Sequence, residues 1–236
     1  MRLTVDLIDS SPSFINPLKD RELSLRGHRI SMLENLGATK DLNDTIDLTD
    51  NDLTSLSNLP RLVRLRRLFL ARNKLMHISP TVASSVPNMT TLVLTSNSIA
   101  NLSDLIPLQA CSKLTYLTLI GNPVTRKENY RLYTIWRIPS VRILDFEKVK
   151  KLEREQAEEL FGTHDSPTEL ATTLSTISTV RTFDLGNKRE AEVDSSRDVR
   201  IKLTAVEREK IIAQLKNAKS LAEIERLEQS LRRLEG

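Results

Sequence analysis

Apolar and polar positions recur along the chain at a regular interval. The pattern L-x-x-L-x-L-x-x-N-x-L is fullest in residues 65–75 and 114–124, with further copies in 89–99 and 42–53 and a degenerate first copy in 23–30. The residues at the asparagine position are His28, Asn51, Asn73, Asn97 and Asn122, separated by 23, 22, 24 and 25 residues. Five copies in register indicate an internal repeat, in which each copy is one structural unit.

The period and the residue types predict an α/β solenoid of the leucine-rich-repeat type, a horseshoe of about five repeats. Each copy forms one short strand of a parallel sheet, and its leucines point into a core that a single copy cannot close. The asparagine side chain can hydrogen-bond turn backbone that has no strand partner, and His28 is expected to do the same as an end rung. Leucines spaced by three residues in 56–62 and 102–108 favour short helical or 3₁₀ turns on the convex side.

Polar caps are expected at both ends of such an array. A helical start at Thr4 predicts the N-terminal cap, and the C-terminal cap gathers Tyr130, Tyr133, Trp136, Val141, Leu144 and Phe146, the last three in a final strand-like turn. We therefore assign 1–162 to the repeat domain with its caps, 163–200 to a flexible polar linker and 201–236 to an amphipathic helical tail.

The strand pattern also predicts a binding face. Side chains beside the inward leucines point to the concave face of the sheet. There Phe69, Val93, Tyr116 and Ile120 form an apolar path across neighbouring strands, with Asp47 and Arg67 beside it. Apolar surface rimmed by charge marks a partner site, and such a groove suits an amphipathic helix. The alternative, isolated apolar residues without a partner, stays open.

Composition excludes several kinds of site. The chain has 38 leucines but 6 Gly, 3 His and 1 Cys, which argues against a disulfide scaffold, a zinc site or a phosphate-binding loop. No Ser, His and acid fall at an enzyme spacing, so we expect a non-enzymatic protein with no cofactor and no metal. The sequence shows no signal peptide and no apolar run of about 20 residues, so no membrane association is expected.

Charge is uneven along the chain. The net charge is +4, and the excess lies in residues 1–162, with 22 basic and 18 acidic side chains. An acidic block in 41–52 adjoins a basic block in 61–74. Such neighbours indicate either a self-compensating surface or a charge pattern that faces a partner.

Several segments resemble one known family. They are RELSLRGHRI at 21–30, ENLGATKD at 34–41, IDLTDNDL at 46–53, LTYLTLIGNPVT at 114–125, YRLY at 130–133, VRILDFEKVK at 141–150 and NAKSLAEIERL at 217–227. These segments look like the A-prime proteins of the U2 small nuclear ribonucleoprotein. The resemblance covers nearly all of 1–162 and resumes in the tail, whereas 163–200 contributes nothing to it.

The resemblance implies a nuclear, spliceosomal adaptor. A helix of an RRM protein of the B-double-prime type would pack on the concave face, and the pair would bind a hairpin of U2 snRNA, mostly through the partner. Basic residues near the two ends are candidates for RNA phosphate contacts: Arg21, Arg26, Arg29, Lys150 and Lys151. The 201–236 tail is a further candidate surface for other spliceosomal proteins. The bare repeat also permits a second hypothesis, a regulatory subunit of a phosphatase or another enzyme.

Overall fold

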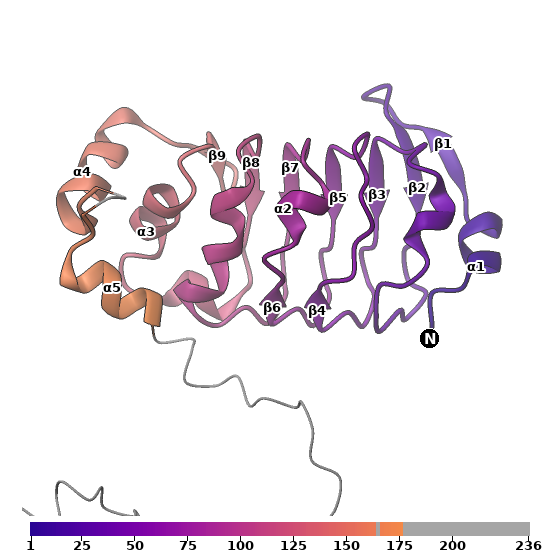
Figure 1. The fold of residues 1–236 in the computed structure, drawn as a ribbon, viewed down its shortest axis with the longest axis horizontal. Helices are drawn as coiled ribbons and strands as arrows, with labels where there is room; N and C mark the ends of the chain where they lie inside the picture. Colours follow the sequence, from indigo (N-terminus) through magenta and orange to yellow (C-terminus); the bar gives the residue numbers. More distant parts are fainter. Residues whose placement is uncertain (164–165, 177–236) are drawn as a thin grey trace, which may run out of the picture. The chain divides into compact units, whose positions relative to one another are not determined.

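Short parallel strands stacked side by side form the centre of the structure, a computed structural model that describes residues 1–163 and 166–176 (Figure 1). The strands are β1 (Ser13–Ile15), β2 (Arg21–Ser24), β3 (Thr45–Asp47), β4 (Ser55–Leu56), β5 (Arg67–Phe69), β6 (His77–Ile78), β7 (Thr91–Val93), β8 (Tyr116–Thr118), β9 (Ile143–Leu144) and β10 (Glu147–Lys148). The α-helices are α1 (Val5–Ser10), α2 (Val82–Ser85), α3 (Tyr130–Arg137), α4 (Lys151–Phe161) and α5 (Glu169–Thr176), and the 3₁₀ helices are η1 (Leu36–Thr39), η2 (Leu102–Ala110) and η3 (Pro123–Arg126).

Eight of the strands join one sheet in the order β1-β2-β3-β5-β7-β8-β9-β10. Neighbours from β2 to β9 are parallel, whereas β1 and β10 pair antiparallel at the two edges. The connectors lie on one side of this sheet, and among them β4 and β6 form a second, two-stranded parallel sheet. The predicted leucine-rich-repeat fold is confirmed, and each edge of the sheet is closed by a hairpin rather than left as a long free strand.

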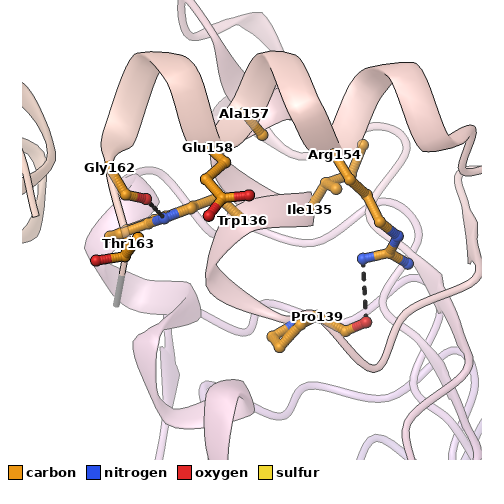
Figure 2. Close-up of a pocket in the computed structure, with 8 residues that line it drawn as sticks. All are labelled: Ile135, Trp136, Pro139, Arg154, Ala157, Glu158, Gly162 and Thr163. Carbon is orange, nitrogen blue, oxygen red and sulfur yellow. Dashed lines mark hydrogen bonds between the residues drawn. The ribbon is translucent and has the colours of Figure 1, made fainter. Parts of the chain in front are cut away.

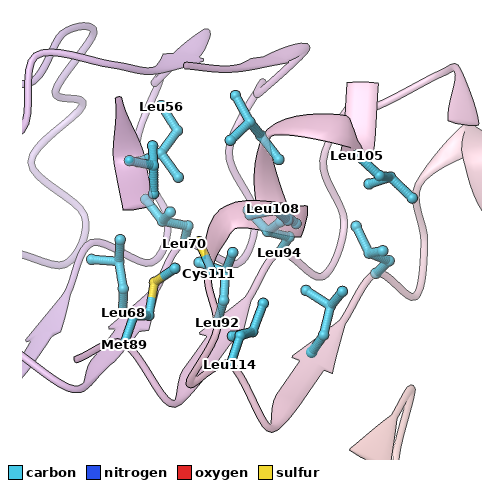
Figure 3. Packing of buried hydrophobic residues seen from close by; sticks show 14 of the residues in the cluster. Leu56, Leu68, Leu70, Met89, Leu92, Leu94, Leu105, Leu108, Cys111 and Leu114 are labelled. Carbon is cyan, nitrogen blue, oxygen red and sulfur yellow. The ribbon is translucent and has the colours of Figure 1, made fainter. Parts of the chain in front are cut away.

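The pattern leucines fill the space between the sheet and the connectors. Leu68, Leu92 and Leu117 pair in register at the centres of β5, β7 and β8, and all three are 0% exposed. Figure 3 shows Leu68 and Leu92 together with leucines from the connectors, among them Leu56 and Leu108, and Leu117 belongs to the same buried cluster. The expected 3₁₀ turn at 102–108 is present as η2, whereas residues 55–56 form a short strand instead of a helical turn.

The repeat asparagines form a buried hydrogen-bonded ladder along the stack. The Oδ1 of Asn97 accepts the backbone N–H of Leu75 at 3.0 Å, and its Nδ2 donates to the carbonyls of Leu70 and Leu94 at 2.8 and 3.0 Å. Asn51, Asn73 and Asn122 repeat this arrangement. Each asparagine therefore satisfies backbone of its own repeat and of the preceding one, where no strand partner is available.

The residue before each ladder asparagine adopts a left-handed backbone. Its φ is 66° at Asp50, 53° at Arg72, 55° at Ser96 and 78° at Gly121. Only glycine adopts this conformation at no steric cost, and a Cβ at Gly121 would approach the Ser96 side chain to 3.0 Å. The chain thus accepts local strain at three turns to bring the asparagine inward.

Two expectations about the first repeats were wrong. His28 is half-buried and makes no side-chain hydrogen bond within the described residues, so the ladder begins at Asn51. Leu42 is 46% exposed, and Asn43, three residues before Ile46, occupies the inward position instead. This copy has three residues between Leu42 and Ile46 where the pattern has two, and Leu42 is the residue that the extra length leaves on the surface.

Both caps form as expected at their cores. The Thr4 side chain accepts the backbone N–H of Leu7 at 3.3 Å and begins α1. At the other end, the rings of Tyr133, Trp136 and Phe161 lie 5.5–5.7 Å apart between α3 and α4. This aromatic cluster replaces the leucine layers where the repeat stops.

The folded region continues past residue 162, which corrects part of the predicted linker 163–200. Helix α5 packs against η2, its Ala171 is 0% exposed, and Ser175 lies 3.2 Å from the Tyr133 hydroxyl. The weak periodicity of this segment concealed it, because only one face of α5 is covered. The 201–236 tail lies outside the described residues. No helix of residues 1–163 and 166–176 has the length and apolar character of a membrane span.

Replacing one rung of the ladder is expected to destabilise the whole repeat domain. Asn97→Ala leaves the Leu75 N–H unpaired in the core and takes from the Leu70 and Leu94 carbonyls one of the two asparagine hydrogen bonds that each accepts, so we expect a loss of about 3 kcal/mol in the free energy of unfolding. Urea denaturation would measure it. Asn88→Ala is the matched control, because the Asn88 side chain makes only exposed hydrogen bonds, donating to the Val63 carbonyl and accepting from the Lys113 ammonium group, and their loss should cost under about 1 kcal/mol. Equal losses in the two variants would contradict the ladder's structural role.

Candidate protein interface on the open face of the sheet

The strand residues beside the buried leucines form the face of the sheet opposite the connectors, here called the open face. Strand register arranges them in two rows: Glu22, Thr45, Arg67, Thr91, Tyr116 and Ile143 in the first, and Ser24, Asp47, Phe69, Val93 and Thr118 in the second. This is the face that the sequence predicted as concave. Its two ends differ in chemistry.

Ion pairs within the chain occupy the open face over β2, β3 and β5, here called the charged half. Arg26 Nη1 lies 2.9 Å from Asp47 Oδ2, and Arg67 forms an ion pair with Asp20. Asp47 is only 4% exposed and also accepts the backbone N–H of Thr49 at 2.9 Å. Asp47 is therefore not a free charge beside an apolar path, because it is already ion-paired with Arg26 and hydrogen-bonded to the backbone.

The apolar half of the open face lies over the later strands. Phe69 and Val93 are half-buried neighbours in the second row. Tyr116 belongs to the first row, and Ile120, 41% exposed, lies beyond the end of β8, so a fully buried Thr118 separates the two. The predicted apolar path thus widens at β8 instead of running in one line.

Sequence reasoning missed one member of this half, Phe146. Its spacing from Leu144 suggested an inward position, but the ring is 68% exposed and lies edge-on to Tyr116, with centroids 6.1 Å apart. The chain reverses between β9 and β10, and this turn breaks the alternation on which the expectation rested. An aspartate before the phenylalanine was the only turn signal in the sequence.

Side chains from α3 and α4 hold the turn between β9 and β10 in place. Arg131 donates to Glu153 at 2.6 and 3.3 Å and to the carbonyl of Leu144 at 3.2 Å. The hydrogen bond from Arg131 holds the pKa of the Glu153 carboxyl below its usual value. Asp145 accepts the Tyr130 hydroxyl at 2.7 Å, and burial together with this carboxylate raises the pKa of Tyr130.

The five basic residues predicted to contact RNA phosphates do not form one patch. Arg21 begins β2, and Arg26 and Arg29 follow its end, whereas Lys150 and Lys151 follow β10. Six strand spacings separate β2 from β10 in the sheet, roughly 30 Å. Arg26 is paired with Asp47, and Lys151 lies 3.4 Å from Glu155. A single phosphate backbone would therefore have to extend along the sheet to reach both groups.

The other candidate sites in the described residues show no reactive arrangement. Burial raises the pKa of the Cys111 thiol to about 11, so it stays neutral near pH 7. A pocket of about 320 Å³ beside α3 and α4 is lined by Ile135, Trp136, Pro139, Arg154, Ala157, Glu158, Gly162 and Thr163 (Figure 2). There Trp136 donates to the Gly162 carbonyl and Arg154 to the carbonyls of Pro139 and Val141, so both of these donors serve the cap. Across residues 1–163 and 166–176, no three His, Cys, Asp or Glu side chains are grouped for a metal ion.

Comparison with known proteins identifies the family to which this chain belongs. A leucine-rich repeat family model matches residues 1–174. The U2 small nuclear ribonucleoprotein A′ of Aspergillus fumigatus is 55% identical over 94% of this chain and 87% of its own length, and that of Schizosaccharomyces pombe is 46% identical over 100% and 98%. The chain belongs to the U2 small nuclear ribonucleoprotein A′ family. This membership favours the ribonucleoprotein hypothesis over the enzyme-regulatory one.

A solved structure of an A′ protein supports the fold directly. The crystal structure of the Drosophila melanogaster SNF/U2A′ complex matches with a TM-score of 0.67 and 47% sequence identity, over 70% of this chain and 95% of that chain. The family model ends at residue 174, close to the end of α5, so the A′ repeat domain includes the helix that sequence reasoning assigned to a linker.

The Arg131–Glu153 pair predicts a pH-dependent contribution to stability. Because the folded state lowers the pKa of Glu153 from 4.5, its stabilisation is complete above that value and is lost as pH falls through the lowered pKa. Glu153→Gln should therefore lose about 1–2 kcal/mol near pH 7, and the deficit should shrink at about pH 3. Urea unfolding of both proteins at the two pH values would measure the difference. A deficit of the same size at both pH values would exclude the ion pair as its cause.

Proposed function

We propose that this chain is a nuclear, non-enzymatic adaptor of pre-mRNA splicing that holds an RRM protein of the B-double-prime type on its open face. The Drosophila relative forms a complex with SNF, and this chain shares 47% identity with it across the repeat domain. The observation that carries the proposal is the apolar half of the open face, where Phe69, Val93, Tyr116 and Ile120 stay accessible on a folded sheet. Such accessible apolar side chains gain free energy when a partner covers them.

The occupant that fits this face is an amphipathic helix. The charged half is neutralised by its own ion pairs, so it offers polar contact without a large unpaired charge. The apolar half offers contact to the hydrophobic stripe of a helix, the recognition mode in which anchors recur every three or four residues. Arg67 and Asp47 border the apolar half. Arg67 is paired with Asp20 and Asp47 with Arg26, so both present ion pairs to a partner instead of free charges.

In this function the RNA hairpin is read mainly by the partner. Lys150 and Lys151 follow the last strand and contribute positive charge toward phosphates without reading bases. Arg21, Arg26 and Arg29 form the second basic group, at the other end of the sheet, and Arg26 contributes less because Asp47 neutralises it. The 201–236 tail is proposed to contact other spliceosomal proteins.

Placing a charge in the apolar half should prevent pairing. Phe69→Asp buries a carboxylate against the partner's apolar stripe, so we expect the affinity for the RRM protein to fall at least about a hundredfold. Isothermal titration calorimetry with purified proteins would measure it, and circular dichroism would verify the fold. Leu152→Asp is the matched control, because Leu152 is 61% exposed on α4, outside the open face. Unchanged affinity in a folded Phe69→Asp protein would contradict the proposed face.

Neutralising two lysines tests the phosphate contacts. Lys150→Gln with Lys151→Gln should weaken binding of the heterodimer to the U2 hairpin and reduce the slope of log K against log salt by up to about 2. Filter binding over a salt series would measure the slope. The same change at Arg126 and Lys127, two exposed basic residues at the end of η3, is the matched control. If both pairs changed the slope equally, the effect would come from net charge and not from contact at 150–151.

A further inference from the structure

The turn between β9 and β10 holds a large aromatic residue in a backbone conformation that such residues avoid. Leu144 pairs with Glu147, so Asp145 and Phe146 are the two central residues of a hairpin, with φ of 53° and 67°. Positive φ at both positions is the type I′ turn, for which Asn-Gly is the favoured sequence. A phenylalanine at the second position is sterically disfavoured and needs support from its surroundings.

The surrounding fold supplies that support. Asp145 accepts the backbone N–H of Leu119 at 2.6 Å and the hydroxyl of the buried Tyr130 at 2.7 Å. Arg131 donates to the carbonyl of Leu144 and lies 3.5 Å from Glu147. Groups on both sides of Phe146 are therefore fixed, and the position of its ring follows from the turn.

Core packing does not account for the ring. Phe146 is 68% exposed, and its aromatic contact is the edge-on one with Tyr116, at an interplanar angle of 71°. A strained residue that presents an apolar ring to solvent is unfavourable for the isolated chain on both counts. Such strain, when the fold enforces it, gathers at sites that bind ligands.

The ring extends the apolar half of the open face to its last strand. From Phe69 on β5 to the turn after β9 there are three strand spacings, about 15 Å, which equals the rise of about ten helical residues. A helix of three turns laid across the strands would therefore contact Phe69 near one end and the Tyr116–Phe146 pair near the other. A two-turn helix would be too short to reach both.

We propose that Phe146 is an anchor of the partner-binding face, and that its ring with that of Tyr116 receives the end of an amphipathic helix from the RRM partner. This inference rests on the proposed function above. It requires apolar side chains along one side of the partner helix over about ten residues. The proposal also accounts for the strained turn. The turn fixes the Phe146 ring before the partner binds, so binding requires little further ordering of the side chain.

Two substitutions at one position separate the ring from the backbone. Phe146→Ala removes the ring and keeps the unfavourable φ, whereas Phe146→Gly removes the ring and relieves the backbone. We expect both to weaken binding of the RRM protein at least about tenfold, as loss of an interface anchor does. The glycine variant should melt about 2–4 °C above the alanine variant. The full chain and the purified RRM protein are used, with affinity from calorimetry and melting from differential scanning.

Phe14→Ala is the matched control. Phe14 is 46% exposed on β1 and pairs with Glu22, so it lies at the opposite end of the same sheet, beyond the charged half. We expect the Phe14→Ala variant to bind the RRM protein with the same affinity as the unaltered chain.

The outcomes separate this inference from the function on which it rests. If the glycine variant binds like the unaltered chain while the alanine variant does not, turn stability and not ring contact matters, and the inference is overturned. If both variants bind normally while Phe69→Asp does not, the inference again falls and the proposed function stands. If the unaltered chain does not bind the RRM protein, both fall.

Discussion

The asparagine ladder is the interaction on which the repeat domain depends. Strands of two to four residues offer few backbone hydrogen bonds, and the chain must leave the sheet after each one. At that point the side chains of Asn51, Asn73, Asn97 and Asn122 supply both a donor and an acceptor to turns of two successive repeats. Buried backbone that would otherwise be unpaired is thereby satisfied, and each repeat is fixed in register with the one before it.

This constraint explains the unusual composition. A ladder with a constant rung spacing requires core layers of nearly constant thickness, which leucine fills and which an aromatic ring would widen. Aromatic residues are therefore displaced to places where the repeat ends or faces outward. Tyr133, Trp136 and Phe161 close the C-terminal end, whereas Phe69, Tyr116 and Phe146 lie on the open face. The scarcity of aromatics in the chain is thus a consequence of the stack, and their locations mark its boundaries and its accessible surface.

Residue spacing was enough to predict the repeat, the inward leucines and the open-face positions of Phe69 and Val93, because these depend on local periodicity alone. Residue spacing could not show that Asp47 is ion-paired with Arg26, since that pair joins side chains of two different repeats. It placed Phe146 inward because alternation fails where the chain reverses. Helix α5 was missed because, among residues 169–175, only Ala171 is fully buried, which is too little apolar signal for a sequence pattern.

The division of the open face follows from the same architecture. Arg67 on β5 pairs with Asp20 before β2, and Arg26 in the turn after β2 pairs with Asp47 on β3, so these ion pairs occupy the face over the first strands. No comparable pairs form over β7 and β8, whose outward residues among the described strands are Thr91, Val93, Tyr116 and Thr118. A partner therefore meets neutralised charge at one end and accessible apolar surface at the other. Because the ladder holds all the strands in register, this asymmetry belongs to the chain itself and exists before any partner binds.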